Sequence, residues 1–399
     1  YKGNYLYTPT YGALHDPFAE VHAYHHTDLI SAWADAQWGI RQDRPIRVIT
    51  NFPLTNAFYG DFDGDGVRDT SYGISDDGFN FAYDSDVVYH EYGHAIVRTV
   101  AGSMSMGADS IGVDWTSGAI NEGTADVFAM VLNGDPLLAE YLGQSERWDT
   151  AIRDLEPDRV CPGNLQSQVH RSGQILGALG WNLIEAIGPE ATAELWVGAL
   201  ASWSSATAWS DVGESLIAAT AILRDAEVIT DDEHDVARAL IAQSGLVDCE
   251  RIIDLSETPS STQTLLNLGL SDDYERFAAG VQFSLTAPPE ATALELEVLE
   301  FDGLADGTGW TIYVRAGQPV GHHATKIEGL GLATAQAEDF DLLVDGEGTG
   351  TIRLDEDSEL ALNPGEVYYF AMASRNLTRA HLDLDYATIS IAGRSLIGQ

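Results

Sequence analysis

The sequence predicts an α+β protein of two domains: a mixed, mainly helical domain over residues 1–253 and a small all-β sandwich over residues 254–399. Three observations support this prediction. The chain has 399 residues, which exceeds the size of one ordinary domain. Apolar residues recur at helical spacing until about residue 248. After about residue 256 the pattern changes to short alternating segments.

The first domain begins with a helical pattern. Residues 18–38, FAEVHAYHHTDLISAWADAQW, place apolar side chains three and four positions apart and predict a helix. Residues 46–52, IRVITNF, are rich in β-branched side chains and predict a strand. Residues 60–85 are rich in Gly and Asp and predict a loop. Further helices are expected at residues 86–102, 119–134, 172–188, 191–203 and 235–245.

The second domain alternates between apolar and polar positions. Turn residues separate its alternating segments at fairly regular spacing, which is typical of a β-sandwich. Strands are expected at residues 281–287, 293–301, 310–317, 341–354 and 365–374.

The composition excludes two classes of partner. The formal net charge of −42, from 62 acidic and 20 basic residues, repels phosphate backbones and argues against nucleic-acid binding. No apolar run approaches the ~18 residues of a membrane span. The chain begins at Tyr1 rather than methionine, so we expect that it is processed or truncated and that a leader was removed. The acidic composition fits a secreted, extracellular protein. We also expect a monomer.

The chain has two cysteines, Cys161 and Cys249. They form either one disulfide or two free buried thiols, and sequence alone leaves both alternatives open.

Residues 87–97, VVYHEYGHAIV, place three titratable groups in one apolar run. His90 and His94 are four apart, so on a helix they share one face. Two neutral imidazoles at this spacing fit two corners of a tetrahedral zinc site, and Glu91 lies between them. The alternative is a pair of core histidines with ordinary hydrogen bonds.

A catalytic zinc site needs a third protein ligand. The extended form H-E-x-x-H-x-x-G-x-x-H requires glycine and histidine where this chain has Val97 and Val100, so it is excluded. The stretch SGAINEGTADVFAM offers Glu122 and Asp126, four apart in an otherwise apolar helix. Two acids are expensive to bury without partners, so we expect Glu122 to bind zinc and Asp126 to accept the outer N–H of a ligand histidine. The alternative is a solvated helix face.

Five motifs occur in one order along the chain: NAFYG (56–60), DSDVVYHEYGHAI (84–96), SGAINEGTAD (117–126), AIRDL (151–155) and VHRSGQILGALGW (169–181). Together they resemble gluzincin metallopeptidases of the thermolysin and fungalysin group, over about residues 15–250. The resemblance implies a two-lobed catalytic domain, with a mixed N-terminal lobe and a mainly helical C-terminal lobe. It also implies a secreted zinc endopeptidase that hydrolyses internal peptide bonds of proteins.

The resemblance also implies residue roles. His90, His94 and Glu122 are expected to bind zinc. Glu91 is expected to be the general base that takes a proton from the zinc-bound water. His170 is expected to donate a hydrogen bond to the oxyanion of the tetrahedral intermediate.

Four further positions are expected to assist the reaction. Asn56 and Ala57 correspond to the edge strand that pairs with the peptide backbone. Arg153 corresponds to an arginine that contacts a substrate carbonyl. Asp126 is the partner of a zinc ligand.

The chain departs from the family pattern in three places. Val113 stands where thermolysin-like enzymes carry a tyrosine that holds the oxyanion. Leu165 stands where the family has an aspartate that orients the catalytic histidine. The segment between His94 and Glu122 is longer than in thermolysin-like enzymes, and we expect it to line one side of the cleft.

The stretch DFDGDGVRD predicts a structural calcium loop. Asp61, Asp63, Asp65 and Asp69 supply carboxylates at near-alternating positions, and Val67 supplies a carbonyl. The alternative is a solvated acidic loop.

Residues 254–399 resemble the small β-sandwich that follows bacterial secreted peptidases, the pre-peptidase C-terminal type. The resemblance implies a module that helps to bind substrate or matrix, with a purely stabilising module as the alternative. Two other functions also remain open for the whole chain: a zinc exopeptidase, and an inactive adhesion or binding protein that retains zinc.

Overall fold

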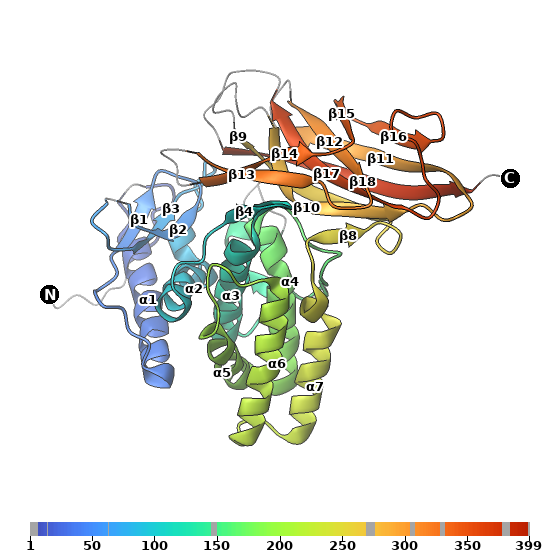
Figure 1. The fold of residues 1–399 in the computed structure, drawn as a ribbon. Helices are drawn as coiled ribbons and strands as arrows, with labels where there is room; N and C mark the ends of the chain where they lie inside the picture. Colours follow the sequence, from blue (N-terminus) through green and yellow to red (C-terminus); the bar gives the residue numbers. More distant parts are fainter. Residues whose placement is uncertain are drawn as a thin grey trace. The chain divides into compact units, whose positions relative to one another are not determined.

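The computed structural model describes residues 7–13, 15–62, 64–144, 150–268, 276–303, 308–327, 332–376 and 384–397. Its described residues combine seven α-helices with several β-sheets, which confirms the α+β class (Figure 1). None of the helices in these ranges has the length and apolar character needed to cross a membrane.

The chain divides into two compact units. Unit 1 comprises Tyr1–Met104, Ile120–Arg159 and Gly173–Val247, and unit 2 comprises Ser105–Ala119, Val160–Ser172 and Asp248–Gln399. The last change from unit 1 to unit 2 along the chain, between Val247 and Asp248, lies close to the boundary expected after residue 253. Two earlier segments also belong to unit 2, so the units do not simply follow one another along the chain.

Unit 1 contains most of the helical residues, and α6 packs against both α5 and α7 (Figure 1). The helices α3 and α4 begin in unit 2 and continue into unit 1. The helices are α1 (Pro17–Trp38), α2 (Ser85–Ala101), α3 (Thr116–Asn133), α4 (Val169–Ile187), α5 (Pro189–Leu200), α6 (Trp209–Asp225) and α7 (Asp231–Gln243), with short 3₁₀ helices η1 (Phe81–Tyr83), η2 (Leu142–Gln144) and η3 (Leu246–Asp248).

The ends of α1 and α2 follow from local sequence. Asp16 caps α1 by accepting a hydrogen bond from the Phe18 amide, and Gly39 ends this helix in the left-handed conformation. Asp84 caps α2 by accepting from the Asp86 amide. The residues that begin these helices therefore have a direct physical role in placing them.

A three-stranded sheet in unit 1 has the order β1-β3-β2, which leaves β2 at one edge. Its strands are β1 (Val48–Phe52), β2 (Ala57–Gly60) and β3 (Asp69–Gly73), and a separate short pair is formed by β6 (Leu137–Leu138) and β7 (Arg153–Asp154). The strand β3 is parallel to β1 and antiparallel to β2.

The predicted loop over residues 60–85 is wrong at β3, which is the central strand of this sheet. All five of its residues are buried, although the first three are polar. Asp69 is satisfied by the backbone amide and the Nε of Arg47, each at 2.9 Å. A strand stabilised by such polar contacts lacks the apolar alternation by which strands are recognised in sequence.

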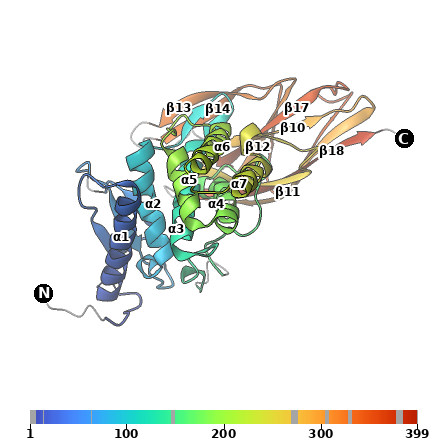
Figure 2. The same ribbon diagram turned by 90° about the horizontal axis from the view of Figure 1, so that it is seen from below.

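Two glycines bring three helices of unit 1 close together. A Cβ atom on Gly93 of α2 would lie 2.9 Å from the Cα of Ala125 on α3. A Cβ on Gly123 of α3 would lie 2.4 Å from the carbonyl oxygen of Gly173 on α4. Figure 2 shows α2 and α3 as neighbours. At these two glycines the backbone of α3 therefore packs directly against the backbones of α2 and α4.

Unit 2 contains most of the strands. A five-stranded sheet has the order β15-β12-β17-β10-β8 and a four-stranded sheet the order β16-β11-β18-β9, while β4-β5 and β13-β14 form two-stranded pairs. The strands are β4 (Gly107–Asp109), β5 (Gly112–Asp114), β8 (Ile252–Asp254), β9 (Ser260–Leu268), β10 (Arg276–Thr286), β11 (Ala291–Gly303), β12 (Thr308–Ala316), β13 (Gly321–Ile327), β14 (Leu332–Asp339), β15 (Leu342–Gly346), β16 (Gly350–Asp355), β17 (Val367–Asn376) and β18 (Leu384–Ile397).

The expected strands all coincide with observed ones: β10, β11, β12 and β17 each contain most of one predicted segment, and β15 with β16 occupy the segment 341–354. Five strands after residue 248 in unit 2 were not predicted, namely β8, β9, β13, β14 and β18. The hairpin β4-β5 also lies in a segment expected to be a loop. The packing of the two larger sheets as a sandwich remains a prediction.

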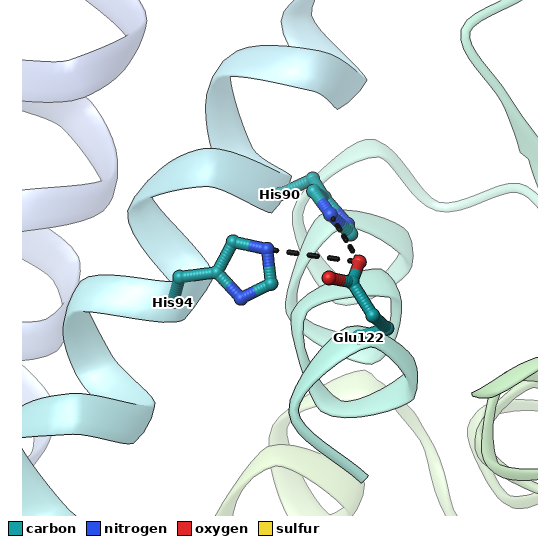
Figure 3. A group of neighbouring side chains, drawn as sticks. All are labelled: His90, His94 and Glu122. Carbon is teal, nitrogen blue, oxygen red and sulfur yellow. Dashed lines mark ion pairs between the residues drawn. The ribbon is translucent and has the colours of Figure 1, made fainter. Parts of the chain in front are cut away.

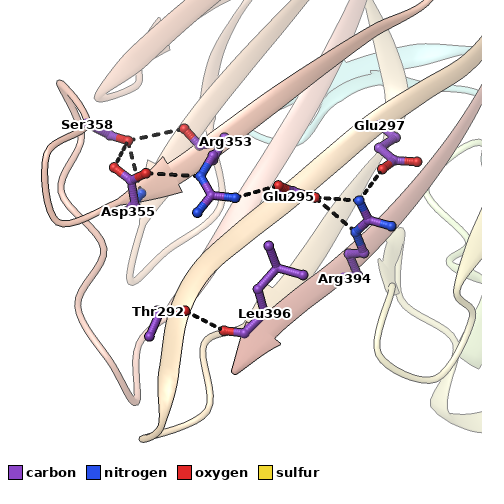
Figure 4. A network of polar contacts seen from close by, with 8 residues as sticks. All are labelled: Thr292, Glu295, Glu297, Arg353, Asp355, Ser358, Arg394 and Leu396. Carbon is purple, nitrogen blue, oxygen red and sulfur yellow. Dashed lines mark hydrogen bonds and ion pairs between the residues drawn. The ribbon is translucent and has the colours of Figure 1, made fainter. Parts of the chain in front are cut away.

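A row of ion pairs crosses the four-stranded sheet (Figure 4). Glu295 of β11 lies opposite Arg353 of β16 and Arg394 of β18, with N–O distances of 2.6 Å to both. Glu297 and Asp355 extend the row at 2.7 and 3.0 Å. Glu295 is buried but both arginines are about half exposed, so each pair contributes little by itself. Together the pairs favour one register of three neighbouring strands.

Cys161 and Cys249 form a disulfide, which resolves the alternative left open by sequence. Both residues belong to unit 2, so the bond joins the segment 160–172 to the start of the β-rich region.

Two buried carboxylates lie at the start of α2. Asp86 accepts hydrogen bonds from the Ala139 amide at 2.9 Å and from the side chain of Asn133. Burial, reinforced by the charge of Asp84, raises the pKa of Asp86 to about 8. Burial likewise raises the pKa of Asp84 to about 6. These groups make the stability of unit 1 sensitive to pH.

We predict that Asp86→Asn flattens the pH dependence of stability. The unfolded chain releases this proton near the usual pKa of 3.8, whereas the folded protein retains it to about pH 8. The folded state binds more protons between these values, so the free energy of unfolding falls as pH rises through this window. Denaturant unfolding in EDTA measures the free energy of unfolding at pH 5 and at pH 8. This free energy should fall more between the two pH values for the wild type than for Asp86→Asn. Equal losses would contradict the burial argument.

A second prediction concerns Gly93→Ala. The new methyl group meets the Ala125 backbone of α3, so we expect the free energy of unfolding to fall by about 1–3 kcal/mol. The matched control is Gly198→Ala in α5, where the nearest atom to a new Cβ is the Cβ of Ala219 at 3.9 Å. There alanine should stabilise the helix by about 0.5–1 kcal/mol. Guanidinium unfolding measures both changes, and a Gly93→Ala protein as stable as the wild type would refute the close approach.

Candidate metal centre

Two facing helices of unit 1 bring together a group of three metal-ligating side chains. His90 and His94 project from α2 toward Glu122 of α3 (Figure 3). One ligand atom from each residue lies within 4.8 Å of the others. Among the described residues, this is the one group of three or more His, Cys, Asp or Glu side chains with such an arrangement.

The distances in this group fit a tetrahedral ion. The Oε2 atom of Glu122 lies 3.1 Å from Nε2 of His90 and 3.7 Å from Nε2 of His94. Ligands about 2.1 Å from a tetrahedral zinc lie about 3.4 Å from one another, between these two values. Two imidazoles and one carboxylate leave a fourth position for solvent, which is typical of catalytic rather than structural zinc.

The outer nitrogen of each histidine is already engaged. Nδ1 of His90 donates to Asp126 at 2.7 Å, and Nδ1 of His94 donates to the amide oxygen of Asn121 at 3.0 Å. Both partners are acceptors at these oxygens, so they direct the Nε2 atoms toward Glu122. Asp126 therefore lies where the sequence predicted it.

Asp126 is shared between a ligand and a buried cation. Its Oδ1 atom accepts from Arg153 at 2.6 Å, and the Arg153 side chain is only 13% exposed. Burial alone would raise the pKa of Asp126, but the charges of Arg153 and His90 hold it below its usual value. Burial alone would lower the pKa of His90, but Asp126 and Glu122 raise it to about 10.

Glu91 is the carboxylate in this centre that lacks a strong partner. Its side chain is buried, and its Oε2 atom makes no hydrogen bond to the residues that the structure describes. Burial raises the pKa of Glu91 to about 7, opposed by the charge of His90. An orphaned buried carboxylate is costly, and a cation with bound solvent beside it would relieve that cost. The donor set and the orphaned oxygen therefore fit a divalent ion such as zinc.

The predicted substrate-binding residues lie at different elements of unit 1. Ala57 begins the edge strand β2, and the carbonyl of Asn56 accepts from the Gly73 amide at 2.9 Å. The helix α2 contacts β2 directly. Arg153 lies on β7 and points at Asp126, so its contact with a substrate carbonyl remains a prediction.

His170 belongs to unit 2, at the first turn of α4. The Gln168 side chain lies 2.8 Å from its Nδ1 atom, and the oxygen of the same amide accepts from the Arg171 backbone at 2.7 Å. This second bond fixes the amide, so its NH₂ group donates to Nδ1. Neutral His170 then carries its proton on Nε2, which is the form needed to donate a hydrogen bond.

Two of the three departures from the family pattern, Val113 and Leu165, are ordinary core positions. Val113 of β5 is buried and its carbonyl accepts from Arg251 at 3.2 Å. Leu165 is buried and its carbonyl accepts from Gln263 at 2.8 Å. The polar partner of the His170 ring is instead Gln168, which sequence reasoning did not identify.

The predicted calcium loop has internal partners for several carboxylates. Asp61 accepts from the amides of Gly64 and Gly66, at 2.9 and 3.0 Å, and Asp65 accepts from the Val67 amide at 2.7 Å. Asp69 is bound to Arg47, as described above. Asp63 lies outside the described residues. Calcium at this loop remains a prediction.

Sequence reasoning missed two residues that hold predicted site residues, Asn121 beside His94 and Gln168 beside His170. Asn121 directly precedes Glu122, so the dipeptide supplies both a ligand and the partner of another ligand. A polar residue beside a predicted ligand on a buried helix was the available signal. Gln168 gave no signal, because a glutamine at the start of a helix is common.

No protein-family model matches the chain, and no curated protein matches it at a significant level. A functional assignment must therefore rest on the site itself.

A third prediction follows from the shared role of Asp126. The Asp126→Asn variant keeps an acceptor for His90 but loses the charge that balances Arg153. We expect the affinity for zinc to fall by about 10–100-fold. Competition with a chelator at pH 7.5 measures the change, and Asp232→Asn on the exposed face of α7 is the matched control. Unchanged affinity in Asp126→Asn would show that this carboxylate does not support the ligand.

Proposed function

We propose that this protein is a zinc-dependent endopeptidase that hydrolyses internal peptide bonds of proteins. The observation that carries the proposal is the orphaned buried Glu91 beside a three-ligand group with one open position. A structural metal site needs no unpaired carboxylate, because such sites are closed by four protein ligands.

His90, His94 and Glu122 would hold the ion. When bound, zinc supplies Lewis acidity and lowers the pKa of a coordinated water toward ~7. Glu91 takes a proton from the attacking water and passes it to the leaving amine. Its raised pKa suits both tasks near neutral pH, because a general base works best when its pKa is close to the ambient pH.

Other residues would stabilise the transition state and the substrate. His170 donates from Nε2 to the developing oxyanion, and Gln168 keeps its proton on that nitrogen. The edge strand β2 begins at Ala57, which is proposed to pair with an extended peptide. Both backbone groups of Asn56 are already bonded, so its proposed contact with the peptide falls to its side chain. The second donor that the family provides by tyrosine is absent at Val113, so the proposal assigns the larger share of this role to His170.

The proposal includes the setting in which the enzyme works. A disulfide between Cys161 and Cys249 suits an oxidising environment and supports secretion. We retain calcium at residues 61–69 as a structural cofactor in this proposal. The β-rich part of unit 2 is proposed as a pre-peptidase C-terminal type of sandwich.

The fourth prediction tests Glu91. The wild type should cleave unfolded casein and also a peptide blocked at both ends, since an exopeptidase needs a free terminus. Glu91→Gln should retain zinc near one ion per chain while its kcat falls by at least about 100-fold, because it loses the general base. Glu185→Gln on the exposed side of α4 is the control.

Two outcomes would contradict the proposal. A wild type that binds zinc but cleaves neither substrate would favour a binding or adhesion protein. A Glu91→Gln variant with normal kcat would remove the general-base role, even if the wild type is active.

A further inference from the structure

Unit 2 includes two segments that lie early in the chain. Ser105–Ala119 contains the hairpin β4-β5 and the first turn of α3, and Val160–Ser172 contains the first turn of α4. The helix α3 continues to the proposed ligand Glu122, and α4 begins with His170. The contacts that hold these two segments within unit 2 therefore determine where two functional helices start.

Gln282 of β10 binds the first segment, Ser105–Ala119, through hydrogen bonds. Its side chain is fully buried, and its NH₂ group donates to the carbonyl of Ile111 at 2.9 Å and to that of Val320 at 2.8 Å. Its oxygen accepts from the Val320 amide at 2.9 Å. Two residues after Val320, the His322 amide donates to the carbonyl of Ser110 at 3.0 Å. The turn between β4 and β5 is thus bound to the β-rich region by buried polar groups.

Arg251 binds the strand that leads into α3. Its guanidinium donates to the carbonyls of Val113 at 3.2 Å and Gly280 at 3.1 Å, and it forms an ion pair with Asp109. A Cβ on Gly280 would lie 2.2 Å from the Val113 carbonyl oxygen. The backbones of β5 and β10 therefore touch here, with Arg251 joining both.

Gln263 of β9 binds the second segment, Val160–Ser172, through hydrogen bonds. Its side chain is fully buried, its oxygen accepts from the Ser167 amide at 3.1 Å, and its NH₂ group donates to the Leu165 carbonyl at 2.8 Å. The Gly280 amide also donates to the Ser167 hydroxyl at 2.9 Å. These bonds end two residues before α4 begins, and the next residue, Gln168, orients His170.

We propose that Gln263, Gln282 and Arg251 are positioning residues that fix the starts of α4 and α3, and through them the orientation of His170 and Glu122. This inference rests on the proposed peptidase function. It makes the β-rich region a working part of the enzyme, in addition to any role in binding substrate or matrix.

The start of a helix affects the site because a tilt there displaces the residues further along the same helix, and because buried hydrogen bonds hold that start in place. Glu122 lies six residues beyond Thr116, about 9 Å along the helix, so a small tilt at the start of α3 moves the ligand. A displacement of about 1 Å can reduce a reaction rate by about 100-fold. Each buried glutamine bonds backbone groups of the segment it holds, so removing its amide leaves those groups without these partners and weakens the attachment of the segment.

The test uses full-length variants with matched controls. Gln263→Met keeps the approximate shape of the side chain but removes its three bonds to residues 165–167. Gln282→Met likewise removes the bond to Ile111, together with those to Val320. Thr262→Val, also on β9, removes a 2.9 Å bond to Ser390 inside the four-stranded sheet and is the control. Zinc affinity, kcat, KM and backbone hydrogen exchange are measured well below the unfolding temperature of each variant.

For Gln263→Met we expect kcat to fall at least about tenfold, with KM within about twofold and zinc retained. Hydrogen exchange of residues 165–171 should become faster in this variant alone. For Gln282→Met we expect zinc affinity to fall about tenfold. Thr262→Val should match the wild type. Ser167→Ala removes the bond from the Gly280 amide and the hydroxyl's own 3.4 Å bond to Gln263, but keeps the backbone bonds of Gln263. It should also lower kcat if Gln263→Met does not fold.

The results distinguish a failure of the positioning roles from a failure of the proposed peptidase function. An active wild type whose Gln263→Met and Ser167→Ala variants keep normal kcat, despite lower thermal stability, would mean that these bonds are only structural. An inactive wild type would overturn the proposed function and the positioning roles together, and an unchanged exchange pattern would show that Gln263 does not hold the segment.

Discussion

The close approach of α2 and α3 is the constraint on which the metal centre depends. Gly93 removes the side chain that would separate the helices, so the backbone of α2 lies against Ala125. Two histidines one turn apart then face a glutamate on the neighbouring helix, at distances that suit a tetrahedral ion. A larger residue at position 93 would move the ligands apart before any ligand itself was changed.

The same packing buries several charges, and their partners differ in a way that bears on function. Asp126 is paired with both His90 and Arg153, and Asn121 holds His94. Glu91 lacks such partners and has a raised pKa near neutrality. The residues beside the proposed ligands thus each have a charged or hydrogen-bonded partner, whereas Glu91 makes no hydrogen bond at its Oε2 atom to the residues that the structure describes. This contrast separates the proposed reaction from simple metal retention.

Sequence could predict the parts of the centre that depend on local geometry. His90 and His94 share a helix face because of their spacing, and Glu122 with Asp126 required partners because acids are costly to bury in an apolar helix. The same reasoning failed where contacts join distant residues. The strand β3 is stabilised by Arg47, and Gln263 and Gln282 bind segments 98 and 171 residues away in the chain. Neither alternation nor spacing carries a signal for such pairs.

X-ray absorption at the zinc edge of the purified, zinc-loaded protein tests the central claim most directly. The account predicts a first shell of two imidazole nitrogens and two oxygens, one from Glu122 and one from solvent, at about 2.0–2.2 Å. The Glu122→Gln variant should lose bound zinc or show a changed shell. A closed shell of four protein ligands, or a zinc that persists unchanged without His90 and Glu122, would contradict the assignment of the open site between α2 and α3.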